Sequence, residues 1–444
     1  MAFPGFNACL STISRWRATR LSVVSSPCRR SSHTPTMRSR FFEHDCDVPA
    51  EPLHRYQTGG YHPVHLGDFL HDGRYKILHK LGWGGYSTVW AARDQKTNTY
   101  VAVKILVAEQ RCQNRELATL RTLKEVQSDQ PGYQNVMTMQ DFFQVQGPNG
   151  THDCLVLEML GPNLGDFIGA YVDEHRYPGK VVKSVVAETL LGLHHLHEQG
   201  IVHGDLHTRN VAFTIPSVQE LREQEFLQKL GDPNTSPIRR VDGAPLEPSM
   251  PQYLVMPTDY PHDCESAFGP VKIIDFGQCF SSNDIPLELH TPISVRPPEV
   301  VFKDKVDYRM DLWSMGCMLF ELVTKQLPFD ALMQTPSGLV AQMLERTDEA
   351  LPRRWQEIWR PMSLENQARR DKLRAKYSLP LEAGRQYGLQ EWLHKMYFET
   401  EQRVDLSQED MFKVGALIHR MLRLEPAARP SARELLQDSW FLET

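Results

Sequence analysis

The sequence contains neither closely spaced cysteines nor a long apolar run. Its eight cysteines are scattered over 444 residues and form no C-x-x-C pair. This spacing argues against a zinc module or a disulfide framework and indicates a reducing compartment. No apolar run reaches the roughly 18 residues that a membrane span requires, so we expect no membrane-spanning segment. We see no internal repeat and no nucleic-acid-binding module, and expect no direct nucleic-acid partner.

Acidic residues and lysine are absent from residues 1–42. This leader contains seven arginines and is rich in serine and threonine. The whole chain has a net charge of −6, and with the +7 of the leader set aside the remaining residues carry −13. Such a leader is typical of a mitochondrial transit peptide, and the expected location is then the mitochondrion. A disordered basic tail, or a true start at Met37, is the alternative.

The rest of the chain changes from strand-like to helix-like patterns. After an N-terminal extension at 43–73, residues 74–160 contain short β-branched and aromatic segments, glycine-rich or polar turns and one helical segment. Residues 161–444 show mainly helical periodicity, interrupted at about 216–269 by a segment rich in Pro, Asp and Gly. We therefore predict an α+β fold, with a small antiparallel sheet, a larger helical part and a surface insertion.

A glycine-rich turn, LGWGGYSTVW at Leu81–Trp90, lies between the first two predicted strands. Gly82 and Gly84 allow backbone N–H groups to approach phosphate oxygens without a side chain in the way. An ordinary glycine-rich hairpin is the alternative. The residues of this turn that we expect to contact a nucleotide are Leu81, Gly82, Trp83, Gly84 and Gly85.

A lysine follows the turn at the end of VAVK, on the third predicted strand. Lys104 lies 22 residues after Gly82, and Glu116 lies in the next predicted helix. An ammonium group held by a carboxylate can bind the phosphates of ATP, so we predict that Glu116 positions Lys104. A solvated strand lysine is the alternative.

Two further motifs supply acidic and amide groups. In HGDLHTRN, Asp205 is expected to accept or orient the proton of an attacking hydroxyl, whereas His203 packs in the core. In VKIIDFG, Asp275 emerges at the end of a buried strand. Asn210 and Asp275 offer the hard oxygen ligands that suit Mg²⁺, so we predict a phosphate and magnesium site.

In this order and context, the motifs resemble the protein kinase family over about residues 74–442. RPPEVVF, with Glu299, and DLWSMGCMLFEL, from Asp311, support the resemblance, and Arg429 matches the arginine that pairs with that glutamate in kinases. The resemblance implies a two-lobed fold, with a β-rich small lobe and a helical large lobe. It also implies that five residues surround the adenine, either in its apolar sandwich or in the hinge: Val89, Ala102, Ala212, Glu158 and Leu160.

A narrower resemblance is to the SR-protein kinases, in a fungal-type branch. The stretch Gly59–Trp90 resembles the start of that family, which also has a spacer between its catalytic loop and its magnesium aspartate. The resemblance implies a monomeric Ser/Thr kinase of the cytoplasm or nucleus that acts on proteins, with Arg/Ser-rich splicing-type proteins as the expected substrates. Arg209 is instead similar to the arginine found at this place in the catalytic loop of tyrosine kinases. The motif HTPISVRPPE favours serine or threonine as the residue that is phosphorylated.

The catalytic loop departs from the family pattern at two positions. Gly204 replaces the arginine that normally holds a phosphorylated activation loop, so the resemblance implies activity without that phosphorylation. His207 replaces the lysine that usually donates to the transferring phosphoryl group. An imidazole is also a donor, but it loses its charge near neutral pH, so we expect the rate to fall as His207 deprotonates.

Two other functions share these motifs. HGDLHTRN also resembles the loop of aminoglycoside and choline phosphotransferases, which act on small molecules but lack the features at 297–299, 311–316 and 429. The other is a pseudokinase scaffold without turnover. It is disfavoured because the four residues whose loss would favour it are all present: Lys104, Asp205, Asn210 and Asp275.

The predicted large lobe contains one strongly basic segment. Residues 360–376 hold six basic and two acidic residues. The resemblance implies an acidic groove that grips arginine-rich peptides, and a basic helical face does not suit that role. If this segment is a docking surface, acidic partners suit it better.

Overall fold

The computed structural model describes most of the chain after the leader. The described residues are 44–109, 115–126, 129–170, 176–258, 260, 269–329, 335–377, 387–399 and 404–442. The transit-peptide prediction for residues 1–42 lies outside them. Residues 43–444 form one compact unit. Within the described ranges, no helix combines the length and apolar character needed to cross a membrane.

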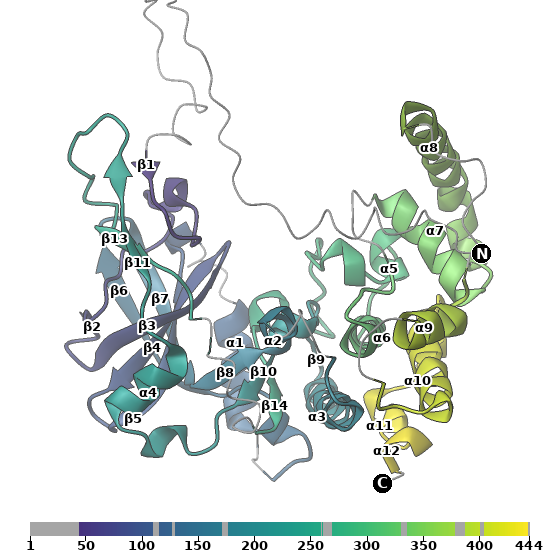
Figure 1. Ribbon diagram of the computed structural model, residues 1–444, viewed down its shortest axis with the longest axis horizontal. Helices are drawn as coiled ribbons and strands as arrows, with labels where there is room; N and C mark the ends of the chain where they lie inside the picture. Colours follow the sequence, from purple (N-terminus) through teal and green to yellow (C-terminus); the bar gives the residue numbers. More distant parts are fainter. Residues whose placement is uncertain are drawn as a thin grey trace, which may run out of the picture. The chain divides into compact units, whose positions relative to one another are not determined.

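An antiparallel six-stranded sheet forms the N-terminal part of this unit (Figure 1). The predicted β-rich region is therefore confirmed, with α1 (Arg115–Glu125) as the helix between its fourth and fifth strands in chain order. Asn98, in the turn between the third and fourth strands in chain order, has a φ of +56°, a conformation that asparagine tolerates. In spatial order the strands are β2 (Phe69–Leu70), β3 (Tyr75–Gly84), β4 (Ser87–Asp94), β5 (Thr99–Leu106), β7 (Gly150–Glu158) and β6 (Met139–Gly147).

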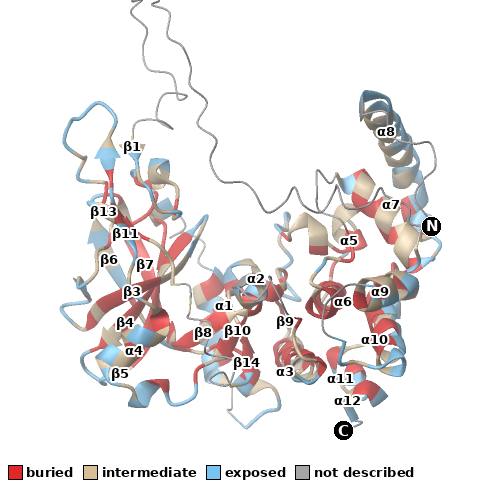
Figure 2. Ribbon diagram, in the orientation of Figure 1, coloured by how far each residue is buried: buried red, intermediate tan, exposed pale blue. Residues whose placement is uncertain are grey.

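The C-terminal part is mainly helical, as predicted. Its central helix α6 (Arg309–Thr324) is buried along nearly its whole length, whereas α3 (Gly179–Glu198) buries one apolar stripe (Figure 2). Ser407 caps the helix that begins at Gln408 by accepting from the Asp410 N–H. The remaining helices are α2 (Leu164–Ala170), α5 (Pro298–Val301), α7 (Pro336–Thr347), α8 (Arg353–Tyr377), α9 (Leu389–Phe398), α10 (Gln408–Met421), α11 (Ala432–Leu435) and α12 (Ser439–Leu442).

The predicted insertion packs against the N-terminal sheet. Its helix α4 (Glu223–Leu230) contacts the sheet through Phe226, whose ring stacks on Tyr100 at 3.9 Å, and through the 2.8 Å ion pair of Glu223 with Lys76. The strands of the insertion are β11 (Thr235–Pro237), β12 (Arg239–Arg240) and β13 (Tyr253–Val255). β11 pairs with β13, and β12 pairs with β1 (His44–Asp45) of the N-terminal extension.

A three-stranded sheet positions the catalytic motifs. β10 (Val211–Thr214) lies between β8 (Leu160–Asn163) and β14 (Val271–Ile273), antiparallel to both. Val211 pairs with Ile273. This pairing brings the end of HGDLHTRN next to the end of VKIID, although the insertion separates them in the sequence.

Candidate active site

Three charged residues that the sequence singled out meet in one hydrogen-bonded network. Lys104 on β5 places its Nζ 2.7 Å from Oε1 of Glu116 on α1 and 2.9 Å from Oδ1 of Asp275. Lys104 and Glu116 are both buried. The predicted positioning of Lys104 by Glu116 is thus present in the geometry, with Asp275 as a second partner.

The network fixes the charge of its members. Burial would lower the pKa of Lys104, but the carboxylates of Asp275 and Glu116 raise it above its ordinary value. Burial would also raise the pKa of Asp275, but Lys104 lowers it to about 2. Burial raises the pKa of Glu116 in spite of Lys104. At neutral pH the site therefore keeps an ammonium group beside a carboxylate.

Hydrogen bonds to a side chain of α6 hold the backbone of the catalytic loop. Oδ2 of the buried Asp311 accepts from His203 N at 2.8 Å, and its Oδ1 accepts from Gly204 N at 2.9 Å. His203 is fully buried and its Nε2 lies 3.1 Å from the Ile274 carbonyl oxygen, which agrees with its predicted packing role. Gly204 has a φ of +76°, and a Cβ there would lie 2.9 Å from the Gln278 carbonyl oxygen. The backbone at position 204 therefore requires glycine for conformational reasons, in addition to the loss of the arginine that the family pattern has there.

Asp205 and Asn210 lie side by side in the loop. Nδ2 of Asn210 donates to the backbone oxygen of Asp205 at 2.8 Å and lies 3.3 Å from its Oδ2. Oδ1 of Asp205 is buried and has no hydrogen-bond partner among the described residues. Burial, and next the charge of Asp275, raise the pKa of Asp205 to about 7. A carboxylate with a free acceptor oxygen is suited to orient a hydroxyl proton.

The structure corrects the expected titration of His207. Burial, followed by the neighbouring charge of His203, lowers the pKa of His207 to about 4. The imidazole is therefore neutral around pH 7, and the expected loss of charge lies well below neutral pH. Nδ1 of His207 accepts from Arg209 N at 3.2 Å, which assigns the proton to Nε2, 3.8 Å from Oδ2 of Asp205. His207 can act as a neutral N–H donor.

The donor set fits a magnesium ion. Because Nδ2 of Asn210 is engaged, the amide is oriented and its Oδ1 remains as an oxygen ligand. Asp275 supplies a carboxylate whose Oδ1 already accepts from Lys104 and from Gly277 N. Amide and carboxylate oxygens are the ligands that Mg²⁺ prefers.

The five residues predicted around adenine fall at the junction of the two parts. Ala102, Leu160 and Ala212 are buried in one apolar cluster, against which Leu81 and Val89 pack. An apolar surface of this kind is typical of the lining of a nucleobase site.

Glu158 and Leu160, the two predicted hinge residues, differ in which of their polar groups remain available to a ligand. The carboxylate of Glu158 is occupied, because its Oε1 accepts from Thr138 N at 2.7 Å and from Lys272 Nζ at 2.9 Å. Only backbone groups of Glu158 are then left for a base. The carbonyl oxygen of Leu160 accepts from Tyr260 Oη at 3.1 Å, a contact from the insertion that sequence reasoning missed.

The glycine-rich turn has open space beside it. Gly82, Trp83 and Gly84 end β3, and Gly85 begins the turn to β4. A Cβ added at Gly82, Gly84 or Gly85 would meet no atom within 4 Å, and none of the three has a positive φ. The fold alone does not require these glycines, so a ligand that approaches the backbone is the better explanation than an ordinary hairpin.

The segment after Asp275 is anchored to the loop and to the C-terminal helices. Thr291 Oγ1 donates to the Gly204 carbonyl oxygen at 2.8 Å, and Arg296 donates to the Thr291 carbonyl oxygen at 2.7 Å. Glu299 and Arg429 form a fully buried bidentate pair, with N–O distances of 2.6 and 2.8 Å. The predicted Glu299–Arg429 contact is confirmed.

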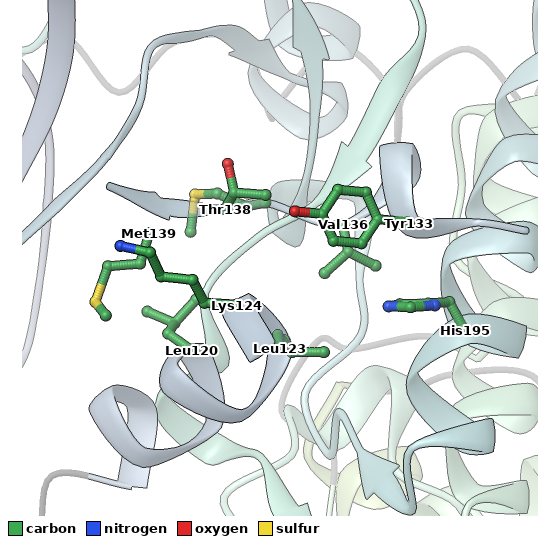
Figure 3. Close-up of a pocket in the computed structure, with 9 residues that line it drawn as sticks. Leu120, Leu123, Lys124, Tyr133, Val136, Thr138, Met139 and His195 are labelled. Carbon is green, nitrogen blue, oxygen red and sulfur yellow. The ribbon is translucent and has the colours of Figure 1, made fainter. Parts of the chain in front are cut away.

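A small pocket behind α1 is separate from this site (Figure 3). Its lining is mostly apolar and includes none of the charged site residues, so it is not suited to phosphates. The residues that line it are Leu120, Leu123, Lys124, Tyr133, Val136, Met137, Thr138, Met139 and His195.

Comparison with known families identifies the class of protein that this fold and site define. The model of the protein kinase domain matches residues 75–226 and 262–441, so the chain belongs to the protein kinase family. The unmatched residues 227–261 lie within the insertion. Protein kinases use ATP and Mg²⁺ and phosphorylate proteins. A crystal structure of a kinase domain, 21% identical, superposes with a TM-score of 0.58 over 86% of this chain and 98% of that chain, which shows the shared fold.

Within the family, the chain is an SRPK-like serine/threonine-protein kinase. It is 30% identical over 413 residues to the serine/threonine-protein kinase SRPK of Physarum polycephalum, covering 89% of this chain and 92% of that kinase. It is 35% identical over 173 residues to human SRSF protein kinase 3, covering 38% of this chain and 30% of that kinase. These relatives favour a protein kinase over the small-molecule phosphotransferase.

Proposed function

We propose that this site binds ATP with Mg²⁺ and transfers the γ-phosphate to serine or threonine hydroxyls of a protein. The observation that carries the proposal is the Lys104–Glu116–Asp275 network, since Asp275 follows β14 and β14 pairs with β10, the strand that follows the catalytic loop. The site is intact, because the four residues that a pseudokinase would have lost are all in place. One chain supplies all of them, which supports activity as a monomer.

Each residue has a separable role in the transfer. Asp205 orients the attacking hydroxyl and accepts its proton at its carboxylate. Lys104 holds phosphate oxygens, and the Nε2–H of His207 donates toward the phosphoryl group as it moves. Asn210 and Asp275 would hold Mg²⁺, which when bound neutralises charge on the phosphates. Because His207 is neutral, its contribution should be smaller than that of a lysine and should not change around neutral pH.

We also propose activity without activation-loop phosphorylation. Gly204 offers no guanidinium for a phosphate, and the Thr291 hydroxyl instead links the segment to the catalytic loop through the Gly204 carbonyl oxygen. This link uses unmodified groups on both sides.

For the substrate we propose an Arg/Ser-rich protein. The name of SRSF protein kinase 3 and the −13 charge of the chain after residue 42 support this choice. The basic helix α8 does not, since its charge would repel arginine. An acidic serine-containing segment is therefore the second candidate.

The test is phosphoryl transfer by the full chain, before and after phosphatase treatment, with Asp205→Ala as the control. Labelled ATP and Mg²⁺ are offered with an Arg-Ser peptide and with an acidic Ser peptide. We expect label in the Arg-Ser peptide, insensitive to phosphatase and lost in the control. Label only in the acidic peptide would reassign the substrate, loss after phosphatase would refute the unmodified activation segment, and no label in either peptide would refute the kinase function.

A further inference from the structure

The glycine-rich turn is held by side chains of the N-terminal extension. Tyr61 Oη donates to the Gly84 carbonyl oxygen at 2.8 Å, and Arg55 Nη2 donates to the Gly85 carbonyl oxygen at 2.9 Å. Together these bonds engage the last carbonyl of β3 and the first carbonyl of the turn from outside the hairpin.

These bonds also orient the N–H groups of the turn. In a trans peptide, a C=O and the N–H of the next residue point in opposite directions. The N–H of Gly85 is therefore directed away from Tyr61, and the N–H of Tyr86 is directed away from Arg55. Backbone N–H groups of such turns are the ones that bind phosphate oxygens.

We propose that Tyr61 and Arg55 are positioning residues for nucleotide binding. They act through the backbone of the glycine-rich turn and do not touch the nucleotide themselves. The inference rests on the proposed function, in which the phosphates of ATP lie against this turn. Without the two donors the turn is free to rotate its peptides, and the nucleotide has to order them on binding.

The extension is built to hold these two donors in place. Tyr61 is 1% exposed, its N–H donates to the Arg55 carbonyl oxygen at 3.0 Å, and Arg55 also pairs with Glu109 at 2.9 Å. The loop from 55 to 61 is so tight that a Cβ on Gly60 would lie 1.7 Å from the Arg55 carbonyl oxygen. Gly60 is thus the sequence feature that allows Arg55 and Tyr61 to reach the same turn.

The insertion packs against the N-terminal extension and stabilises it. β12 pairs with β1, and Asp47 N donates to Ser236 Oγ at 3.2 Å. Apolar side chains of both segments form one buried cluster that includes the Tyr61 ring. The members of this cluster from the insertion are Ile238, Met250 and Leu254.

The test is equilibrium binding of MgATP to the full chain, measured by calorimetry. Loss of one hydrogen bond to the turn is expected to weaken ATP binding by about five-fold in Tyr61→Phe, and by about twenty-fold when Arg55→Met is added. The KM for a peptide substrate should not change, because the proposal places the nucleotide, and not the peptide, against this turn. The matched control is Tyr253→Phe, which removes a hydroxyl that accepts from Leu66 N at 3.0 Å and does not reach the turn. Its ATP affinity should equal that of the unaltered chain.

The outcomes separate this inference from the proposed function. If the unaltered chain does not bind MgATP, the proposed function fails. If it binds and Tyr61→Phe binds equally well, the positioning role is wrong. If Tyr61→Phe and Tyr253→Phe weaken binding to the same extent, the effect is general loosening of the extension and the positioning role is again wrong.

Discussion

Replacing Arg429 with methionine should destabilise the fold severely. The guanidinium makes four hydrogen bonds, two to the Glu299 carboxylate and one each to the carbonyl oxygens of Arg309 and Arg423. The pair is fully buried, so Arg429→Met leaves the Glu299 charge without a partner and without water. Breaking a buried pair on one side costs about 3–5 kcal/mol. The double variant Glu299→Leu/Arg429→Met removes both charges and should recover part of this loss.

The measurement is urea unfolding of the four members of this mutant cycle. Trp313 is a suitable fluorescence reporter, because the Arg429 guanidinium carbon lies 5.1 Å from its ring. The coupling free energy is the difference between the double variant and the sum of the single ones. A loss below about 1 kcal/mol in Arg429→Met, or a double variant that loses as much as both single variants together, would contradict the reasoning.

Two further predictions concern backbone strain and acid stability. Gly204→Ala should lower stability by more than the matched Gly200→Ala, because both positions have a positive φ but a Cβ meets an atom within 4 Å only at 204. The cost of a side chain at a positive φ, which both variants share, is about 1–2 kcal/mol. Equal unfolding midpoints of the two variants would show that the close contact at position 204 does not affect stability. Burial, with a contribution from His152, lowers the pKa of His62 to about 4. Since the unfolded chain takes up this proton near pH 6.5, the associated stability, at most about 3 kcal/mol, should be lost as the pH falls from 6.5 to 4. A His62→Gln variant should show a smaller loss in thermal unfolding scans over this range; an unchanged pH profile would speak against His62.

Much of the fold could be predicted because its signals are local. Short β-branched and aromatic segments between glycine-rich or polar turns predict the strands from Tyr75 onward, and helical periodicity predicts α3, α6 and α10. The path of the insertion could not be predicted in this way. Its contacts with the sheet, such as Phe226 on Tyr100, join residues more than 100 positions apart, and no short-range pattern encodes them.

In the candidate site, too, some features could be predicted from the sequence and others could not. Lys104, Asp205 and Asp275 could be assigned to one site because each lies in a motif whose order along the chain is informative. The protonation of His207 could not, since it depends on burial by residues from elsewhere in the chain. Tyr61 was likewise missed, although the GGY sequence at 59–61 marks a tight loop.

The β10–β14 pairing has a consequence for how the protein folds. Phe213 and Val271 are register partners although they lie 58 positions apart in the sequence, and this pairing completes the magnesium site. Closing a flexible loop of that length carries a length-dependent entropy cost of about 4 kcal/mol. If α4 docks on the sheet before these strands meet, the effective loop becomes shorter. We therefore expect the sheet and insertion to form first and the catalytic machinery to assemble late, so that a chain whose insertion fails to dock would fold slowly into an inactive intermediate.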